Sequence, residues 1–379
     1  MRIVWLNWRD VANPEGGGSE VYLETIARGL AARSHDVTVI CAAHDQAPAD
    51  EIVDGVRFRR VGGKLSVYHR ARRLLKTPEF ADVDVVVDTH NGIPFLAPWA
   101  TKAPVVVLVH HVHREQWPVV YDPIRARFGW WVESTLAPYV YRHCGYITVS
   151  KASRNELVEL GVDDQRISLV PNGTVEIPQQ ATNPAPHPHL VVLGRLVPHK
   201  QVEHAIAAVA RLRVEFPDLT LTVVGDGWWK PELIAYAQRA GVADRVIFTG
   251  HVSEDQKLTE LSQAWVLALP SLKEGWGLVV MEAASCGVPT VAYEDAGGVC
   301  ESVRHGDTGL LTEGNLDSFT AAIADLLRDH QLRQKLGAKA RIHAADYTWT
   351  NSVDAFEGNL LAAQARGRRP SRHSAPNSR

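Results

Sequence analysis

The chain contains 379 residues, of which 45% are hydrophobic and 22% are charged, and its formal net charge is −3. This length exceeds what one hydrophobic core usually organises, so we expect two domains, and the small net charge argues against a nucleic acid as partner. The four cysteines lie far apart without a CxxC pair, which argues against a zinc site and against a disulfide framework.

The first half of the chain alternates short β-branched runs with helical patterns, which is typical of parallel strands joined by helices. We expect a helix at residues 20–32 and strands at 3–6, 36–42, 83–87, 105–109 and 146–149. Residues 1–170 are therefore predicted to form a Rossmann-like domain. No stretch is apolar for long enough to form a signal peptide or a membrane span, so we expect a cytoplasmic protein.

Three consecutive glycines, Gly16, Gly17 and Gly18, separate the first strand from the first helix. Glycine lets the backbone approach a ligand closely, and the start of a helix attracts anions. Gly17 and Gly18 are therefore candidates for contact with a ligand that carries phosphate.

Residues 65–76 form a basic amphipathic pattern, which favours a solvated helix face. Its cations are Arg70, Arg72, Arg73 and Lys76. Contact with an anionic membrane or with an acceptor stays open as a second interpretation.

Aromatic residues gather further on, where Trp130 and Trp131 precede Tyr139 and Tyr141. They resemble a platform for carbohydrate, but their helical spacing favours packing in the core.

Three histidines, His110, His111 and His113, follow the strand expected at residues 105–109. Neighbouring residues on a strand point to opposite faces, and no carboxylate accompanies these histidines at a recognised ligand spacing. We therefore expect no metal site there. Loop histidines without a special role are the alternative to functional ones.

Residues 171–189 contain five prolines and no apolar periodicity, which indicates a linker between domains. The alternation then restarts, with strands expected at 190–193, 219–224, 246–248, 266–269 and 290–292 and helices at 202–215, 231–241, 254–263 and 278–286. Residues 190–349 are thus predicted to form a second Rossmann-like domain. Helices are also expected at 315–329 and 350–365, the latter returning to the first domain, and residues 366–379 form a basic tail expected to be disordered.

A pair of cations, Arg195 and Lys200, stands between the strand at residues 190–193 and the next helix. An arginine fork and a lysine charge at the carboxyl end of a parallel strand can neutralise a departing diphosphate and replace a divalent ion. A solvated surface pair is the alternative. The nearby Gly225 and Gly227 lack a third glycine, so the dinucleotide fingerprint of an NAD-dependent oxidoreductase is not satisfied.

Two acids, Glu274 and Glu282, stand eight residues apart around a loop with Gly275 and Gly277. The glycines allow close approach of a ligand, and the N–H groups at the start of the following helix offer a diphosphate site. The acids could then bind sugar and ribose hydroxyls. The alternative is a helix cap and an ordinary acid on a helix surface.

The stretch EGWGLVVMEAASCGVPTVA, residues 274–292, resembles the signature of retaining GT-B glycosyltransferases of the glycosyltransferase family 4 type, and the likeness runs through nearly the whole chain. The resemblance implies an α/β fold of two doubly wound Rossmann-like domains, acceptor domain first and donor domain second, facing a central cleft. It also implies that Glu274 contacts the donor sugar and Glu282 the ribose. His110 is favoured as the histidine near the reacting sugar, and His111 stays open as a contact to sugar or acceptor.

Together these arguments predict two sets of site residues. The catalytic set is Arg195, Lys200, Glu274 and His110, and the donor-binding set is Gly17, Gly18, Gly275, Gly277, Leu278, Val279 and Glu282. The resemblance implies transfer of a hexose from a UDP- or GDP-linked donor to a carbohydrate, lipid or small-molecule acceptor, with retained configuration and without metal or cofactor. A nucleotide-sugar epimerase, a phosphorylase or a catalytically silent sugar-nucleotide-binding protein are the alternatives. Peripheral contact with the inner face of the membrane is an added expectation.

Overall fold

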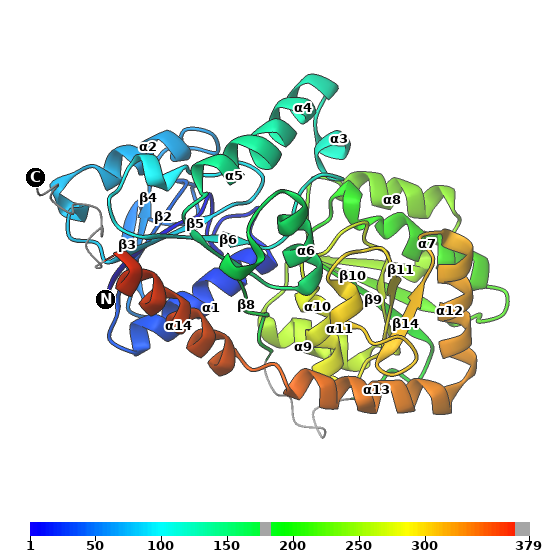
Figure 1. The fold of residues 1–379 in the computed structure, drawn as a ribbon. Coiled ribbons are helices and arrows are strands. Elements are labelled where there is room, and N and C mark those ends of the chain that lie inside the picture. The colour runs from blue at the N-terminus through cyan, green and yellow to red at the C-terminus, as the bar shows by residue number, and fades with distance from the viewer. Residues whose placement is uncertain (175–182, 368–379) are drawn as a thin grey trace, which may run out of the picture.

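The computed structural model describes residues 1–174 and 183–367. They form two α/β domains that lie side by side (Figure 1). The expected fold class, two Rossmann-like domains with mostly parallel sheets, is confirmed.

The sheet of the first domain has eight strands in the order β3-β4-β2-β1-β5-β6-β7-β8. The strands are β1 (Arg2–Leu6), β2 (Asp36–Cys41), β3 (Asp50–Val53), β4 (Val56–Arg60), β5 (Val85–Thr89), β6 (Val105–Val109), β7 (Gly145–Thr148) and β8 (Ile167–Leu169). All neighbours pair in parallel except β3 and β4, which form an antiparallel hairpin at one edge. The central strands are apolar along their length because helices cover both faces.

One face of this sheet packs against α1 (Gly18–Ala32) and α14 (Trp349–Gly367), and the other against α2 (Val67–Leu75) and the helices between β6 and β8. Those helices are α3 (Trp117–Val120), α4 (Pro123–Trp131), α5 (Ala137–Val140) and α6 (Lys151–Glu159), with a π-helical turn at Val132–Leu136 between α4 and α5. Short 3₁₀ turns occur at Pro78–Phe80, Ala97–Trp99 and Asp164–Arg166.

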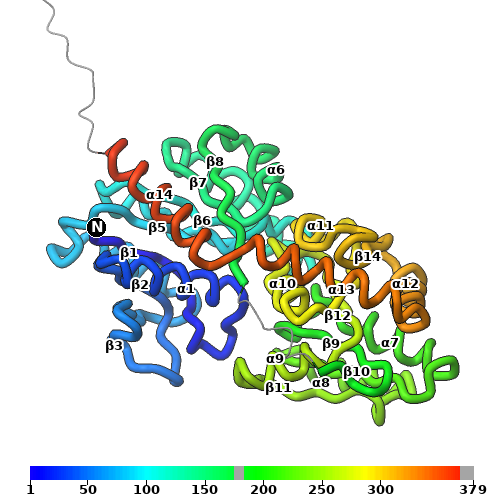
Figure 2. The backbone as a smooth tube through the Cα atoms, turned by 90° about the horizontal axis from the view of Figure 1, so that it is seen from below, coloured from blue at the N-terminus to red at the C-terminus, as the bar shows by residue number. Residues whose placement is uncertain are grey.

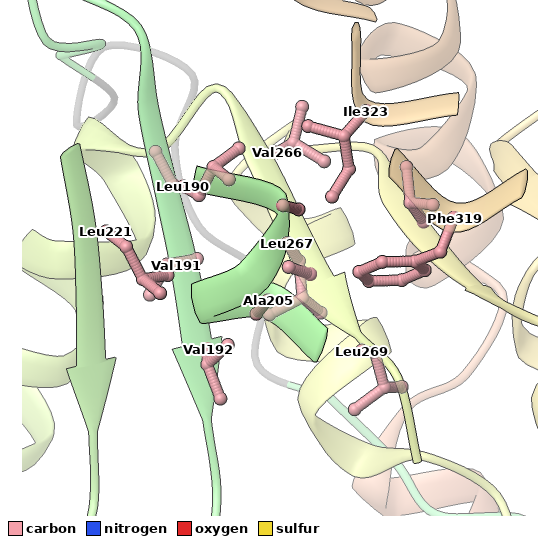
Figure 3. Packing of buried hydrophobic residues seen from close by; sticks show 14 of the residues in the cluster. Leu190, Val191, Val192, Ala205, Leu221, Val266, Leu267, Leu269, Phe319 and Ile323 are labelled. Atoms are coloured by element: carbon pink, nitrogen blue, oxygen red, sulfur yellow. The ribbon is translucent and has the colours of Figure 1, made fainter. Parts of the chain in front are cut away.

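The second domain is built on six parallel strands in the order β11-β10-β9-β12-β13-β14. These are β9 (His189–Leu193), β10 (Thr220–Val224), β11 (Val246–Gly250), β12 (Val266–Leu269), β13 (Thr290–Tyr293) and β14 (Gly309–Thr312). The helices are α7 (Val202–Leu212), α8 (Lys230–Arg239), α9 (Glu254–Gln263), α10 (Leu278–Ser285), α11 (Val299–Ser302), α12 (Leu316–Arg328) and α13 (His330–Ala345), with 3₁₀ turns at Pro198–Lys200 and Ala243–Arg245. Strands and helices meet in one apolar core, in which Phe319 and Ile323 of α12 face Leu267 (Figure 3).

Helix α14 leaves the second domain and packs on the first (Figure 2). Its Phe356 ring stacks on Trp5 of β1, with centroids 4.9 Å apart and planes 14° from parallel. The two segments that connect the domains run beside each other, because Thr174 bridges Thr348 and the Ser352 hydroxyl donates to the Pro171 carbonyl at 2.8 Å. Residues 175–182 of the expected linker and 368–379 of the expected tail lie outside the described residues.

The expectation that the aromatic residues at 130–141 pack in the core is wrong for two of them. Trp131 and Tyr139 are 48% and 63% exposed, whereas Tyr141 is fully buried. The helical spacing that suggested a core places Trp131 on the outer side of α4. Among the described residues, no helix is long and apolar enough to cross a membrane.

Candidate active site

The strand order of each sheet reverses beside its first strand, because β1 lies between β2 and β5, and β9 lies between β10 and β12. Ligands of open α/β sheets bind at such points, outside the carboxyl ends of the strands. The loops after β1, β6, β9 and β12, with the first residues of α1 and α10, carry all the predicted site residues except Glu282, which lies further along α10.

The glycine loop of the first domain meets the second domain. Gly17 caps α1, and its backbone N–H donates to the buried Glu20 carboxylate at 2.8 Å. A Cβ atom placed on Gly17 would lie 3.1 Å from the Arg195 Nε atom, and one on Gly18 would lie 3.7 Å from a methyl carbon of Leu278. The structure therefore brings the glycine loop beside Arg195 and Leu278 of the second domain.

The cations after β9 lie in a compact cluster. Lys200 ends a 3₁₀ turn, and its Nζ atom lies 2.5 Å from Glu274 Oε1. Arg195 and Lys200 line one small pocket together with Ser271. Burial, assisted by the neighbouring Arg9 charge, lowers the pKa of Arg195 to about 10, so its guanidinium still carries a charge at neutral pH.

Gly225 and Gly227 hold the loop that carries Arg195. A Cβ atom on Gly225 would overlap the Gly194 carbonyl, and one on Gly227 would overlap the Leu196 carbonyl. The Leu196 N–H also donates to the Asp226 carbonyl at 2.9 Å. These glycines therefore allow close packing between the loop after β10 and the loop that carries Arg195.

The loop from Glu274 to Gly277 is fixed within its own domain and touches the other. The Glu274 N–H donates to the Ala296 carbonyl, and the Glu274 carbonyl accepts from the Gly298 N–H. Gly277 caps α10 with φ of +81°, in the left-handed region that favours glycine. A Cβ on Gly275 would lie 2.5 Å from the His110 carbonyl, so Gly275 and His110 meet across the two domains.

The two candidate histidines differ in their surroundings. His110 is buried, its ring meets Tyr22 edge-on at 5.2 Å, and its carbonyl accepts from the Ser153 hydroxyl at 2.8 Å. Burial lowers the pKa of His110 to about 4, so the ring is neutral at physiological pH. His111 is partly buried, and its Nε2 atom lies 3.0 Å from the Gln116 side-chain nitrogen. Burial lowers the pKa of His111 well below its ordinary value.

Sequence reasoning missed the acid that orders this histidine loop. Glu133, in the π-helical turn, is buried and accepts hydrogen bonds from the His113 N–H, the His113 Nδ1 and the Trp117 indole at 3.0, 2.9 and 2.7 Å. Burial opposes its charge, yet these partners lower the pKa of Glu133. The spacing of residues gave no sign of this carboxylate, because the fold brings it to His113 from 20 residues further along the chain.

A third cation, Arg9, was also missed. It is buried, its Nε atom lies 3.0 Å from Glu20, and its guanidinium lies over the Trp8 ring at 4.3 Å. The only signal in the sequence was a basic residue soon after β1. Arg9 adds a guanidinium on the first-domain side, opposite Arg195.

Several buried polar atoms around this cluster have no partner within the described residues. They include His110 Nε2, His199 Nδ1 and Ser271 Oγ. Buried polar atoms are usually hydrogen-bonded, so these unpaired atoms beside the cations are available to bond a polar ligand. Burial and the charges of Lys200 and Arg195 lower the pKa of His199 to about 4.

The second acid of the signature has a different partner from the first. Glu282 Oε1 lies 2.6 Å from Lys257 Nζ, on α9, and Lys257 also pairs with Glu254 at 2.7 Å. Burial raises the pKa of Glu282, while Lys257 opposes that shift. In residues 1–174 and 183–367, no three His, Cys, Asp or Glu side chains are grouped so that they could hold a metal ion.

Two family models together match residues 16–343 of the chain. The family model described as "Glycosyltransferase Family 4" matches residues 16–175, and the one described as "Glycosyl transferases group 1" matches residues 174–343. A GDP-mannose-dependent alpha-(1-6)-phosphatidylinositol monomannoside mannosyltransferase of Mycobacterium tuberculosis is 30% identical over 86% of this chain and 90% of its own. The chain belongs to glycosyltransferase family 4.

Other relatives of this glycosyltransferase are similar over their full length. A mannosyltransferase of the same description from Mycolicibacterium smegmatis is 29% identical over 95% of this chain and 98% of its own. The solved structure of sucrose-phosphate synthase from Thermosynechococcus elongatus superposes with a TM-score of 0.80 at 20% identity, covering 97% of this chain and all of that one. That likeness shows the shared two-domain fold of the glycosyltransferase.

Proposed function

We propose that this family 4 glycosyltransferase transfers a hexose from a nucleotide sugar to a hydroxyl group of a glycan or glycolipid, with retained anomeric configuration. The observation that carries the proposal is the cluster of Arg195, Lys200 and Glu274 at the carboxyl ends of β9 and β12, facing the glycine loop and His110. The mycobacterial relatives, named as GDP-mannose-dependent enzymes, support GDP-mannose as the first donor to test.

In this proposal the cations bind the diphosphate that leaves. Arg195 and Lys200 neutralise charge that grows on the diphosphate oxygen as its bond to the sugar breaks, and such preorganised electrostatics supplies a large part of catalysis. The Lys200–Glu274 ion pair holds both groups in place before the donor binds. When phosphate engages Lys200, Glu274 becomes free to accept hydrogen bonds from sugar hydroxyls.

The transfer itself needs no protein nucleophile. The bond from the anomeric carbon to the diphosphate oxygen breaks, the acceptor oxygen attacks from the same face, and its proton passes to the departing phosphate. His110 remains neutral because burial lowers its pKa to about 4, so it can donate or accept a hydrogen bond at the sugar. Glu282 contacts the ribose, with Lys257 competing for the same oxygen.

A thermal-shift comparison of GDP-mannose, UDP-glucose and ADP-glucose tests the donor. A ligand at about 100 times its dissociation constant adds about 2.7 kcal/mol of stability, so the true donor raises the melting temperature by a few degrees. GDP-mannose is expected to give the largest shift. No shift with any of the three nucleotide sugars would contradict the proposed donor site.

A second test concerns the metal and the reaction type. We expect transfer to continue after exhaustive chelation, because Arg195 and Lys200 supply the counter-charge to the diphosphate. Loss of transfer with EDTA and recovery with magnesium or manganese would contradict metal-independent transfer. Epimerised donor formed without any acceptor would favour the nucleotide-sugar epimerase instead.

A further inference from the structure

A ridge of apolar side chains stands exposed on the helical arm of the first domain. The apolar ridge consists of Tyr121, Ile124, Phe128 and Trp131, which are 43%, 82%, 64% and 48% exposed. Helix α4, which carries the last three, lies along the upper edge of the molecule, away from both sheets (Figure 1). Aromatic and branched side chains at such exposure, grouped on one helix, mark an interaction surface.

The ridge is continuous because of helical geometry. Ile124, Phe128 and Trp131 are spaced i, i+4 and i+7, so they lie on one side of α4. At about 100° per residue, Arg127 flanks this stripe on one edge and Arg125 on the other. Both arginines are exposed. The outer side of α4 is therefore an apolar stripe with one arginine on each edge.

The inner side of α4 prevents the helix from turning to hide this stripe. Gly129 packs so closely on the Trp117 ring that a Cβ atom there would overlap it. The Trp117 indole is in turn held by the buried Glu133 carboxylate at 2.7 Å. The N-terminus of α4 is fixed by Asp122, whose carboxylate accepts from the N–H groups of Ile124 and Arg125 at 3.1 Å. The exposure of the ridge is thus built into the fold.

The charges around the ridge identify the kind of partner. Arg114 and Arg142 lie over the Trp130 and Tyr139 rings at 4.8 and 4.7 Å, which adds cations on the same arm. Of the nearby acids, Asp122 pairs with Arg125 and Glu115 with Lys273. An apolar stripe bordered by arginines matches a bilayer surface, where apolar groups enter the acyl boundary and guanidinium groups reach lipid phosphates.

We propose that the apolar ridge of α4 docks on a bilayer that contains anionic phospholipids. The segment from α3 to α5 connects this surface to the site. Helix α3 lies against the turn that ends at Lys200, and Trp117 of α3 bonds the same Glu133 carboxylate as His113. An acceptor held in the headgroup layer would then lie beside the histidine loop. The proposal goes beyond the proposed function and is tested without donor or acceptor.

Vesicle flotation with the full chain tests this docking. We expect the protein to float with vesicles of phosphatidylcholine and phosphatidylglycerol in equal parts, and less with phosphatidylcholine alone. Ile124→Asn combined with Phe128→Ser is expected to lower binding by about tenfold or more. Arg125→Gln combined with Arg127→Gln should lower binding to the anionic vesicles only. Thermal melting of each variant verifies that it folds like the wild type.

The matched control changes equally exposed apolar residues of the other domain. Val214 and Ile342 are 85% and 70% exposed, and Val214→Asn combined with Ile342→Asn is expected to leave binding unchanged. Wild-type flotation of the ridge variant would overturn the proposal. A second result would also overturn it: the wild type does not bind vesicles, and light scattering shows that the wild type is a dimer and the ridge variant a monomer. The ridge would then join two copies of the chain.

Discussion

At the residue scale, the charge on Lys200 decides how well the site can bind a diphosphate. Lys200→Met keeps the apolar stem and removes the ammonium group, so we expect kcat/KM to fall about ten- to hundredfold, as for loss of one charged hydrogen bond. Arg195→Met should behave alike. Lys230→Met is the control. Lys230 lies at the start of α8 in the same domain and pairs with Asp226, so its replacement should leave kcat/KM at the wild-type value. Unchanged kcat/KM in both site variants, measured at subsaturating donor, would rule out this electrostatic role.

His110 makes the stability of the protein depend on pH. Its pKa is lowered from 6.5 to about 4 by burial, so the unfolded chain binds a proton that the folded protein does not. Stability must therefore fall as the pH drops from about 6.5 towards 4. Between pH 7 and pH 5 this histidine lowers the free energy of unfolding by about 2 kcal/mol.

Urea unfolding at pH 7 and pH 5 measures that loss. For His110→Gln, we expect the free energy of unfolding to change between pH 7 and pH 5 by about 2 kcal/mol less than for the wild type. The reason is that the variant lacks one buried histidine that is neutral in the folded protein. Exposed His305 provides the comparison, since His305→Gln should leave the difference unaltered. Parallel results for wild type and His110→Gln would show that His110 keeps its ordinary pKa.

Most candidate site residues that follow strands were predicted from the sequence, although Arg9, which follows β1, was missed. Glu133, which reaches the site only through the fold, was missed as well. Arg195, Lys200 and Glu274 come directly after buried strands, where parallel topology collects loop residues at one edge. Glu133 lies in a helical turn, and only tertiary packing brings it to His113. No local pattern records such a contact.

At the element scale, the loop before α10 needs glycine at Gly275 for a reason that lies in the other domain. A Cβ atom there would meet the His110 carbonyl at 2.5 Å, and opening the two domains relieves that clash. Gly275→Ala is therefore expected to have the melting temperature of the wild type but a higher KM for the donor. With saturating donor, X-ray scattering should give a larger radius of gyration for this variant than for the wild type.

Gly298→Ala is the matched variant for comparison. Its Cβ atom would overlap the Gly275 carbonyl of the same domain and would lie 3.0 Å from the Ser150 Cβ atom of the first domain, so opening the domains leaves the overlap with Gly275 in place. We expect this variant to lose stability by about 1–3 kcal/mol in thermal or urea unfolding, in contrast to Gly275→Ala. If both variants melt alike, the interdomain explanation for Gly275 is incorrect.

The elements that the sequence did not predict also have physical reasons. Strands β3 and β4 form an exposed edge hairpin with charged residues, although the turn Asp54-Gly55, with φ of +49° and +80°, was a readable signal. Helix α13 packs against α10 through small residues, and Gly337 approaches the Gly287 carbonyl so closely that no side chain fits. Small residues produce little apolar periodicity, whereas buried parallel strands produce continuous apolar runs.

At the scale of the whole molecule, the last helix is part of the first domain's core. Phe356 is fully buried against Trp5, so Phe356→Ala is expected to lower the free energy of unfolding by about 3–5 kcal/mol. Phe319→Ala removes an equally buried ring from the second domain. Limited proteolysis should then cut the first domain faster in Phe356→Ala and the second faster in Phe319→Ala. Cleavage confined to the second domain in both variants would contradict this role of α14.

The return of α14 also sets the order in which the domains can be completed on the ribosome. Strand β1 and helix α1 are synthesised first, but the surface that Trp349–Gly367 covers stays open until almost the whole chain has been translated. The strands and core helices of the second domain lie between His189 and Ala345, so that domain has all its parts earlier. Domains generally fold as units once their residues have emerged. The domain that is translated first is therefore the one that finishes folding last, and during elongation its unfinished apolar face is the part of the nascent chain most in need of a chaperone.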